Sequence, residues 1–198
     1  MTDSTILTDV GPFTRDEVEI LSTRKVEPEW LREQRMKAHA AFAEAPMPST
    51  REEEWRYTDI AARLDLDALS LAEEAKPAAS VSALPQGLRS LVEAAGTSSA
   101  RLAQVDSSVV LRELPGELSS QGVLLMGLDE AVREHPELVE KHLGTAVTAE
   151  AGKFAAMNAA LWAGGTFLYV PEKVRVEIPV RSFRWITRGG SAVFGRTL

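Results

Sequence analysis

Three histidines, His39, His135 and His142, are the side chains best suited by type to bind a metal ion, because imidazole is the commonest metal ligand in proteins. His135 and His142 lie seven residues apart, a spacing that could place both on one face of a single helix. Pro136 argues against one continuous helix, and a pair of histidines without a third ligand is a weak metal signal. The pattern therefore favours histidines at the surface or at helix ends.

Carboxylates and aromatic rings gather between Pro48 and Asp59. The run Glu52–Glu54 could attract a cation or a basic partner, but such runs are more often solvated faces. Trp55 and Tyr57 could anchor a partner surface. We interpret both rings instead as packing this segment onto the core.

Two glycine pairs and two carboxylates complete the candidates. Gly164-Gly165 precedes a strand-like run, whereas a phosphate-binding loop needs a strand, then glycines, then a helix. Gly189-Gly190 is typical of a turn between strands. Glu172 and Glu177 alone are poor support for a polysaccharide-active β-solenoid enzyme, which needs clustered carboxylates. The sequence therefore predicts no catalytic, cofactor-binding or metal-binding residue, and a protein that is not an enzyme.

Composition narrows the class of protein further. The 198 residues carry a formal net charge of -7, and such a chain repels phosphate backbones, which argues against nucleic-acid binding. There is no cysteine, so thiolate ligands and disulfides are excluded from this stretch. No apolar run approaches the roughly 20 residues of a membrane span, and Met1–Thr5 lacks the basic start of a secretory signal. We expect a cytoplasmic protein that does not bind membranes.

The elements that would position these residues are helical at first. Thr14 and Glu17 fit a capping box that starts a helix, and Pro28 occupies the expected first position of a second helix. Pro46 ends that helix because proline cannot donate the next hydrogen bond. The Ala-, Ser- and Pro-rich stretch 75–82 is typical of a loose surface linker.

Strands and helices then mix. The sequence predicts strands at 101–105, 109–112 and 122–126, a turn at Pro115-Gly116, and helices at 128–134, 136–144 and 148–163. After Gly165 the pattern predicts short strands at 166–170, 174–178, 183–187 and 192–198. Such spacing favours a meander, a sandwich or a β-solenoid. The sequence ends inside the last of these strands, and because a solenoid rung is buried only by neighbouring rungs, we expect a truncated chain.

Two stretches carry a family resemblance. Residues 48–59, Pro-Ser-Thr-Arg-Glu-Glu-Glu-Trp-Arg-Tyr-Thr-Asp, resemble a segment near the N-terminus of SufD-like proteins. Residues 153–171, which begin Lys-Phe-Ala-Ala-Met-Asn and contain Gly164-Gly165, resemble a segment shared by SufB and SufD. The chain thus resembles the scaffold family of the SUF iron–sulfur cluster assembly system over about residues 20 to 198, with SufD-like preferred.

The resemblance implies a fold and a set of partners. It implies an α+β chain with a helical N-terminal region and linker at 1–100, a mixed strand and helix segment at 101–165, and the first rungs of a right-handed parallel β-helix at 166–198. It also implies a SufB-like or SufD-like paralogue and the SufC ATPase as partners of the full-length protein, with the iron–sulfur cluster handled by the full complex. The family's cluster-building residues and SufC-binding helices are expected beyond residue 198. The alternative is a stand-alone, non-catalytic protein-binding module with a small β-unit.

Overall fold

The computed structural model describes residues 10–96 and 98–198, so Met1–Thr5 lies outside the described residues. The chain forms two compact units, and neither is continuous in sequence. The first unit contains the described residues up to Ser70 together with Gly144–Leu161, and the second contains Leu71–Leu143 and Trp162–Leu198. The family resemblance implied domain boundaries at residues 100 and 165. The two units have other boundaries, because residues 144–161 pack with the N-terminal helices.

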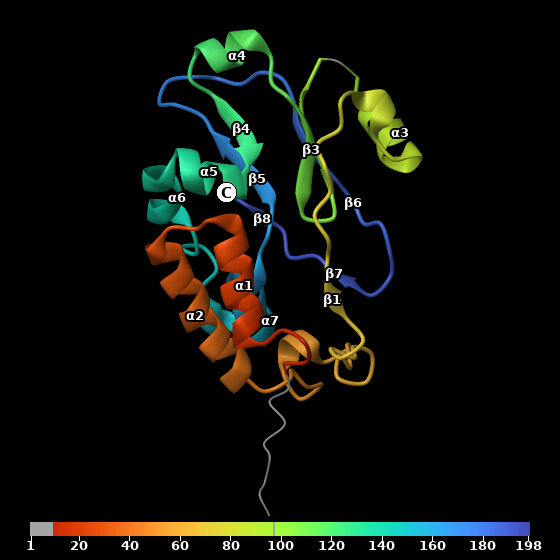
Figure 1. Cartoon of the computed structure of the whole chain (residues 1–198), viewed down its shortest axis with the longest axis vertical. Coiled ribbons are helices and arrows are strands. Elements are labelled where there is room, and N and C mark those ends of the chain that lie inside the picture. Colours follow the sequence, from red (N-terminus) through yellow and green to blue (C-terminus); the bar gives the residue numbers. More distant parts are fainter. Residues whose placement is uncertain (1–9, 97) are drawn as a thin grey trace, which may run out of the picture. The chain divides into compact units, whose positions relative to one another are not determined.

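The first unit is built from three α-helices, α1 (Arg15–Lys25), α2 (Glu29–Glu44) and α7 (Lys153–Leu161), which Figure 1 shows. The Thr14 hydroxyl accepts a hydrogen bond from the Glu17 N–H at 3.3 Å, so α1 starts where the capping pattern predicts. Pro28 is the residue just before α2 rather than its first residue, and α2 ends before Pro46 as predicted. Fully buried Leu31 and Phe42 give α2 its core-facing side.

The predicted helix over 148–163 is shorter in the structure. A single 3-10 turn, η3 (Ala149–Ala151), is followed by Gly152, whose φ is 137°. Glycine adopts that conformation readily, whereas residues with a side chain rarely do. Gly152 therefore interrupts the helical backbone between η3 and α7. Ala156 and Ala160 of α7 are fully buried, and their small side chains let the helix approach its neighbours closely at these positions.

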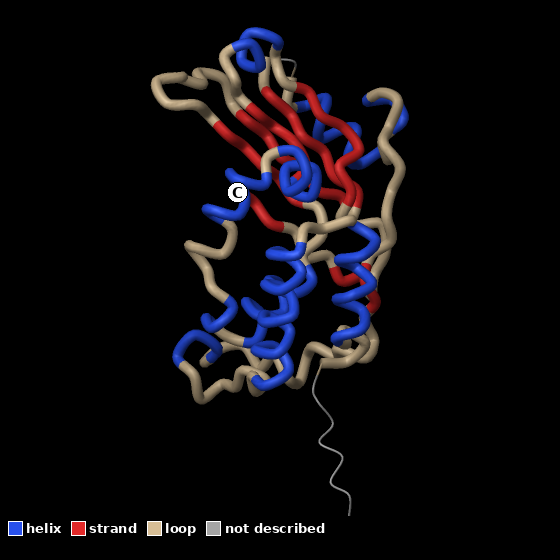
Figure 2. The backbone as a smooth tube through the Cα atoms, turned by 60° about the vertical axis from the view of Figure 1, so that its left-hand side comes forward, coloured by secondary structure: helices blue, strands red, loops and turns tan. Residues whose placement is uncertain are grey.

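The strands of the second unit form two three-stranded sheets, whose strands lie side by side in Figure 2. In the first, β2 (Ala100–Val105) is central, antiparallel to β3 (Ser108–Glu113) and parallel to β6 (Val180–Trp185). In the second, β5 (Gly165–Tyr169) is central, antiparallel to β4 (Leu124–Gly127) and parallel to β8 (Arg196–Thr197). A further short pair joins β1 (Ser70–Leu71) to β7 (Ser191–Ala192).

Strand β2 is buried on both faces because each face has its own apolar partners. Ala103 and Val105 pack with Leu88 and Val92 of α3 (Gln86–Ala94), while Ala100 and Leu102 pack with Leu125 of β4. The alternation of side chains along a strand thus supplies two separate apolar clusters from one strand. This explains why β2 reads as a continuous buried run.

The remaining helices of the second unit are short. Helices α5 (Leu128–Glu134) and α6 (Pro136–His142) match their predicted positions. The predicted turn at Pro115-Gly116 is wrong, because Pro115 instead precedes the short helix α4 (Gly116–Ser120). Proline fits this place because the first helical N–H groups have no partner within the helix.

The stretch 75–82, predicted as a loose linker, is tied to the second unit. The Ala78 N–H donates to the Val110 carbonyl at 2.9 Å, and the Ala75 N–H donates to the Ser108 hydroxyl at 2.9 Å. Ala75, Ala78 and Val81, the last in the 3-10 turn η2 (Val81–Ala83), also pack on the apolar cluster under α3. These half-buried side chains and backbone hydrogen bonds therefore attach the stretch to the second unit.

The predicted strands after Gly165 need correction in three places. Residues 174–178 form no strand, because their backbone finds no neighbouring strand within the part of the chain that the structure describes. Strand β6 begins at Val180 instead of 183, and 192–198 is divided between β7 and β8. The fold class is α+β, as predicted.

Candidate functional site

The two stretches that carry the sequence motifs meet in the first unit. The 3-10 turn η1 (Glu53–Trp55) ends at Trp55. The centres of the Trp55 and Phe154 rings lie 5.5 Å apart, with an interplanar angle of 45°. Trp55 is half-buried, so it packs its segment onto α7 as expected. Tyr57 contradicts the same expectation: it is 88% exposed, with the Arg56 guanidinium 5.4 Å from its ring centre.

The acidic run next to Trp55 is solvated, as its composition predicts. The Glu52 carboxylate accepts a hydrogen bond from the Ser49 N–H at 2.8 Å, which closes the start of the turn. Glu53 lies 3.5 Å from the Arg56 guanidinium, and both side chains are exposed. These charges are engaged with their own loop, so they form local structure and no convergent site.

Lys153, the first residue of the second motif, is buried at 2% exposure. Its Nζ donates to the carbonyls of Phe42 and Ala45 at 3.1 and 2.8 Å and lies 4.8 Å from the Phe42 ring centre. These carbonyls belong to the end of α2, where the helix dipole favours a cation. The lysine of the motif therefore joins α7 to α2.

A second buried cation joins the same helices. Arg35 of α2 forms a two-point ion pair with Glu27, at 2.7 and 2.6 Å, and donates to the Ala160 carbonyl of α7 at 2.9 Å. Both partners are almost completely buried. Since a planar guanidinium matches a carboxylate in this geometry, the pair fixes the turn between α1 and α2 against α7.

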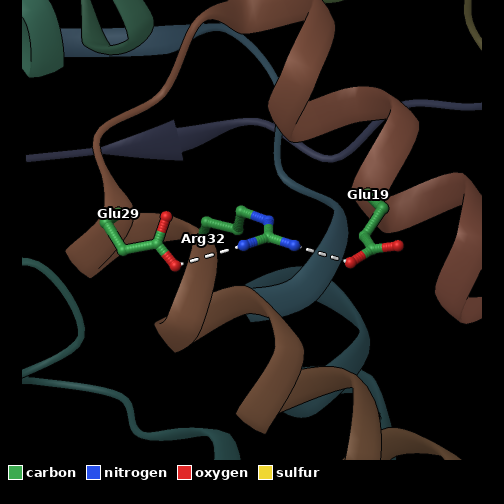
Figure 3. Close-up of polar contacts among 3 residues, drawn as sticks. All are labelled: Glu19, Glu29 and Arg32. Carbon is green, nitrogen blue, oxygen red and sulfur yellow. Dashed lines mark hydrogen bonds and ion pairs between the residues drawn. The ribbon is translucent and has the colours of Figure 1, made fainter.

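An exposed ion-pair cluster links α1 and α2 on their outer side. Figure 3 shows the Arg32 guanidinium between two carboxylates, Glu19 at 2.8 Å and Glu29 at 3.1 Å. The hydrogen bond to Glu19, followed by the two negative charges, raises the pKa of Arg32. The cluster is open to solvent, so we assign it to surface structure.

In the second unit, the glycine pair of the motif allows two backbones to approach closely. A Cβ on Gly164, whose φ is 65°, would lie 1.7 Å from the Ser107 carbonyl oxygen. A Cβ on Gly165, whose φ is 116°, would lie 2.0 Å from the Arg196 carbonyl oxygen. No side chain fits at either position, so the pair is required for the packing of β5 against the β2–β3 turn and β8.

A buried polar cluster lies beside this glycine pair. The Gln104 amide, 1% exposed, accepts from the Gly165 N–H at 3.0 Å and from Arg184 Nη2 at 3.3 Å. It donates to the hydroxyls of Thr166 at 3.3 Å and Ser182 at 3.4 Å, which are themselves 2.8 Å apart. Gln104 lies on β2 and Ser182 and Arg184 lie on β6, all in the first sheet. Thr166 lies on β5 of the second sheet, so the two sheets share the cluster.

Arg184 gives this cluster its charge. Loss of solvent around its guanidinium lowers the pKa of Arg184. Within the part of the chain that the structure describes, no carboxylate forms an ion pair with it. A guanidinium beside hydroxyl groups can hold an anion, but it offers no general acid or base at neutral pH. The sequence reading missed this cluster because its members are up to 80 residues apart.

The histidines do not converge. His39 is buried, contrary to its predicted surface place, and its Nε2 lies 2.9 Å from the Phe13 carbonyl while its ring meets Phe42 edge-on. His135 stands between α5 and α6, and His142 is the last residue of α6. Among the described residues, no group of three or more His, Asp or Glu side chains is arranged to hold a metal ion.

The other candidates are surface features. Glu172 and Glu177 form exposed ion pairs with Lys173 and Arg175, at 3.8 and 3.4 Å. Gly189-Gly190 forms the turn that leads from β6 to β7, with Gly190 at a φ of 75°. Across residues 10–96 and 98–198, no helix has both the length and the apolar character needed to span a bilayer.

Comparison with known proteins places these features in a family. The sequence signature described as the SufBD protein N-terminal region matches residues 16–181. An iron–sulfur cluster assembly SufBD family protein of Mycobacterium tuberculosis (strain ATCC 25618 / H37Rv) is 32% identical over 188 residues, which cover 90% of this chain and 21% of that protein. A SufBD family protein of Staphylococcus haemolyticus is 31% identical, and the iron–sulfur cluster assembly protein SufB of Bacillus subtilis is 29% identical. Each covers 99% of this chain, and the chain spans 43% of their length.

Proposed function

The chain belongs to the SufBD family of iron–sulfur cluster assembly proteins, and from this we propose that it is a component of the scaffold complex on which the clusters are built. The observation that carries the proposal is the family signature across residues 16–181. The geometry supports a structural role, because Lys153, Phe154 and Gly164-Gly165 of the second motif all join backbone or core elements. In this proposal the chain is not an enzyme.

We propose further that the protein is SufD-like and works in the cytoplasm. The SufD-like assignment rests on the stretch from Glu53 to Thr58, which resembles SufD-like proteins. The partners in this proposal are a SufB-like paralogue and the SufC ATPase, joined through the full-length protein. The iron–sulfur cluster is then cargo of the whole complex, held by residues outside this chain.

We propose that the second unit begins a right-handed parallel β-helix. Support comes from the two parallel strand pairs, β2 with β6 and β5 with β8. Parallel strands need long connections, and repeated parallel pairing is how a solenoid stacks its rungs. Gly165 supports the same arrangement, because the absence of a Cβ lets β5 pass close to β8.

The test uses the gene and its products. The DNA beyond codon 198 is sequenced first, and the encoded protein is then co-expressed with SufC and with a SufB-type or a SufD-type paralogue. We expect a stable complex with SufC and the SufB-type paralogue, and no complex between the 198-residue chain alone and SufC. Co-purification of this chain alone with SufC would contradict the proposed position of the docking helices. Preferential pairing with a SufD-type paralogue would make the protein SufB-like.

A further inference from the structure

The connection between β5 and β6 contains a strand-like segment, Val174–Ile178, that joins no sheet formed by the residues the structure describes. Its burial alternates: Val174, Val176 and Ile178 are half-buried, whereas Arg175 and Glu177 are exposed, with side-chain exposures of 86% and 74%. Ile178 packs on the apolar cluster of Ala100, Leu102 and Leu125. One face of the segment is therefore attached to the core of the second unit, as in a half-buried strand.

The backbone of this segment has no partner among the described residues. The Val174 N–H closes a turn onto the Pro171 carbonyl at 3.1 Å, but no N–H or carbonyl of residues 175–178 takes part in a backbone hydrogen bond. A cavity of about 590 Å³ lies alongside, between the segment and α4, lined by Arg175, Glu177, Ile178 and Leu118. Backbone groups in this state are open to pairing with an added strand.

From these observations we infer that Val174–Ile178 is a docking edge that pairs with the same segment of a second copy of this chain. A contact between identical surfaces must be complementary to itself. In an antiparallel pair centred on Val176, Arg175 of one copy lies opposite the partner copy's Glu177, and the reverse contact repeats it. Val174 then lies opposite Ile178, and Val176 opposite Val176, on the apolar face.

The charges of Arg175 and Glu177 favour the antiparallel pair over a parallel pair in which identical residues face each other. A parallel, in-register pair would place Arg175 opposite Arg175 and Glu177 opposite Glu177, and like charges directly opposite each other destabilise a strand pair. The antiparallel pair converts the Arg175–Glu177 contact within each chain, now 3.4 Å, into two contacts between chains. A single short strand pair buries little surface, so the dimer belongs to the weak, transient class.

The test is sedimentation equilibrium of the 198-residue chain over a wide range of concentration, with three charge variants. We expect a concentration-dependent dimer for the unchanged chain. Arg175→Glu or Glu177→Arg alone places like charges opposite each other at two positions, and we expect each to weaken association about tenfold. The double change Arg175→Glu with Glu177→Arg restores both opposite-charge contacts, so it is expected to restore association.

Exposed side chains elsewhere provide the matched control. Reversing the ion pair between Arg188 and Glu73, which lie 3.4 Å apart on the same unit, is expected to leave association unchanged. Circular dichroism of every variant confirms that the fold is retained. A monomer at all concentrations would overturn the inference. So would a dimer that ignores the charge changes, or a double variant as weak as the single ones, since another surface would then be responsible.

Discussion

The two units of this chain are stabilised by different means. In the first, long charged side chains reach across helices: Lys153 caps the end of α2, and Arg35 joins Glu27 to α7. In the second, backbones touch where side chains are absent, at Gly164 and Gly165. Both kinds of contact involve one continuous motif, residues 153–171. Its lysine lies in α7 of the first unit, and its glycine pair lies at the start of β5 in the second.

This difference predicts how substitutions in the two halves of the motif affect stability. A cation that bonds to carbonyls can shift by small side-chain rotations, whereas a Cβ inside a backbone contact has nowhere to go. The second half of the motif is therefore expected to tolerate fewer substitutions than the first half. Residues that resemble a family pattern can thus be required for packing.

The largest effect is expected from Gly164→Ala. The new Cβ would overlap the Ser107 carbonyl at a positive φ, and we expect a loss on the order of 5 kcal/mol of unfolding free energy, the exceptional range for one substitution. Hydrogen exchange checks both size and place: amides of β2 and β5 should lose protection while those of α1 and α2 keep it.

Gly189→Ala is the matched control for that prediction. Its added Cβ would meet nothing within 4 Å, so stability should hardly change. If Gly164→Ala proved as mild as Gly189→Ala, the close approach of β5 to the β2–β3 turn would be refuted, and the contrast between the units would disappear.

The next effect tests the first unit. Glu27→Gln keeps the shape of the side chain but leaves the buried Arg35 without a compensating charge, and we expect a loss of about 3 kcal/mol. Urea denaturation followed by circular dichroism measures it. Arg32→Gln is the control, because the contacts of Arg32 with Glu19 and Glu29 are exposed and should matter little. Equal effects of the two changes would contradict the role of burial.

Much of the fold follows from local sequence signals, and the rest does not. Thr14 and Pro46 predict where α1 begins and where α2 ends, because capping and a missing N–H act within a few residues. The pattern at 174–178 failed as a strand prediction because a strand also needs a neighbour. The burial of Lys153 and the contacts of Gln104 depend on residues 61 to 111 positions away, and no local pattern contains that information.

Trp55→Ala should have a smaller effect than the changes above. It removes a half-buried ring from Phe154 and is expected to cost about 1.5 kcal/mol, since an aromatic pair adds to the apolar surface it buries. Thermal unfolding measures the loss. Tyr57→Ala, two residues on, removes an exposed ring and should stay within about 0.5 kcal/mol. The opposite ranking would mean that Tyr57, and not Trp55, holds this segment.

The smallest effect concerns acid stability of the first unit. A hydrogen bond from its own backbone, then one from the Thr148 hydroxyl, and last the charge of Lys37 lower the pKa of Glu150. A carboxyl whose pKa is lower in the folded state adds stability above its unfolded pKa and loses it as the pH falls through the folded value. Glu150→Gln should therefore lower stability slightly at neutral pH and leave it unchanged at low pH. Melting temperatures across the acid range measure this difference. Thr148→Val removes the hydroxyl alone and should give a smaller change of the same sign, whereas a difference that grows toward low pH would contradict the direction of the shift.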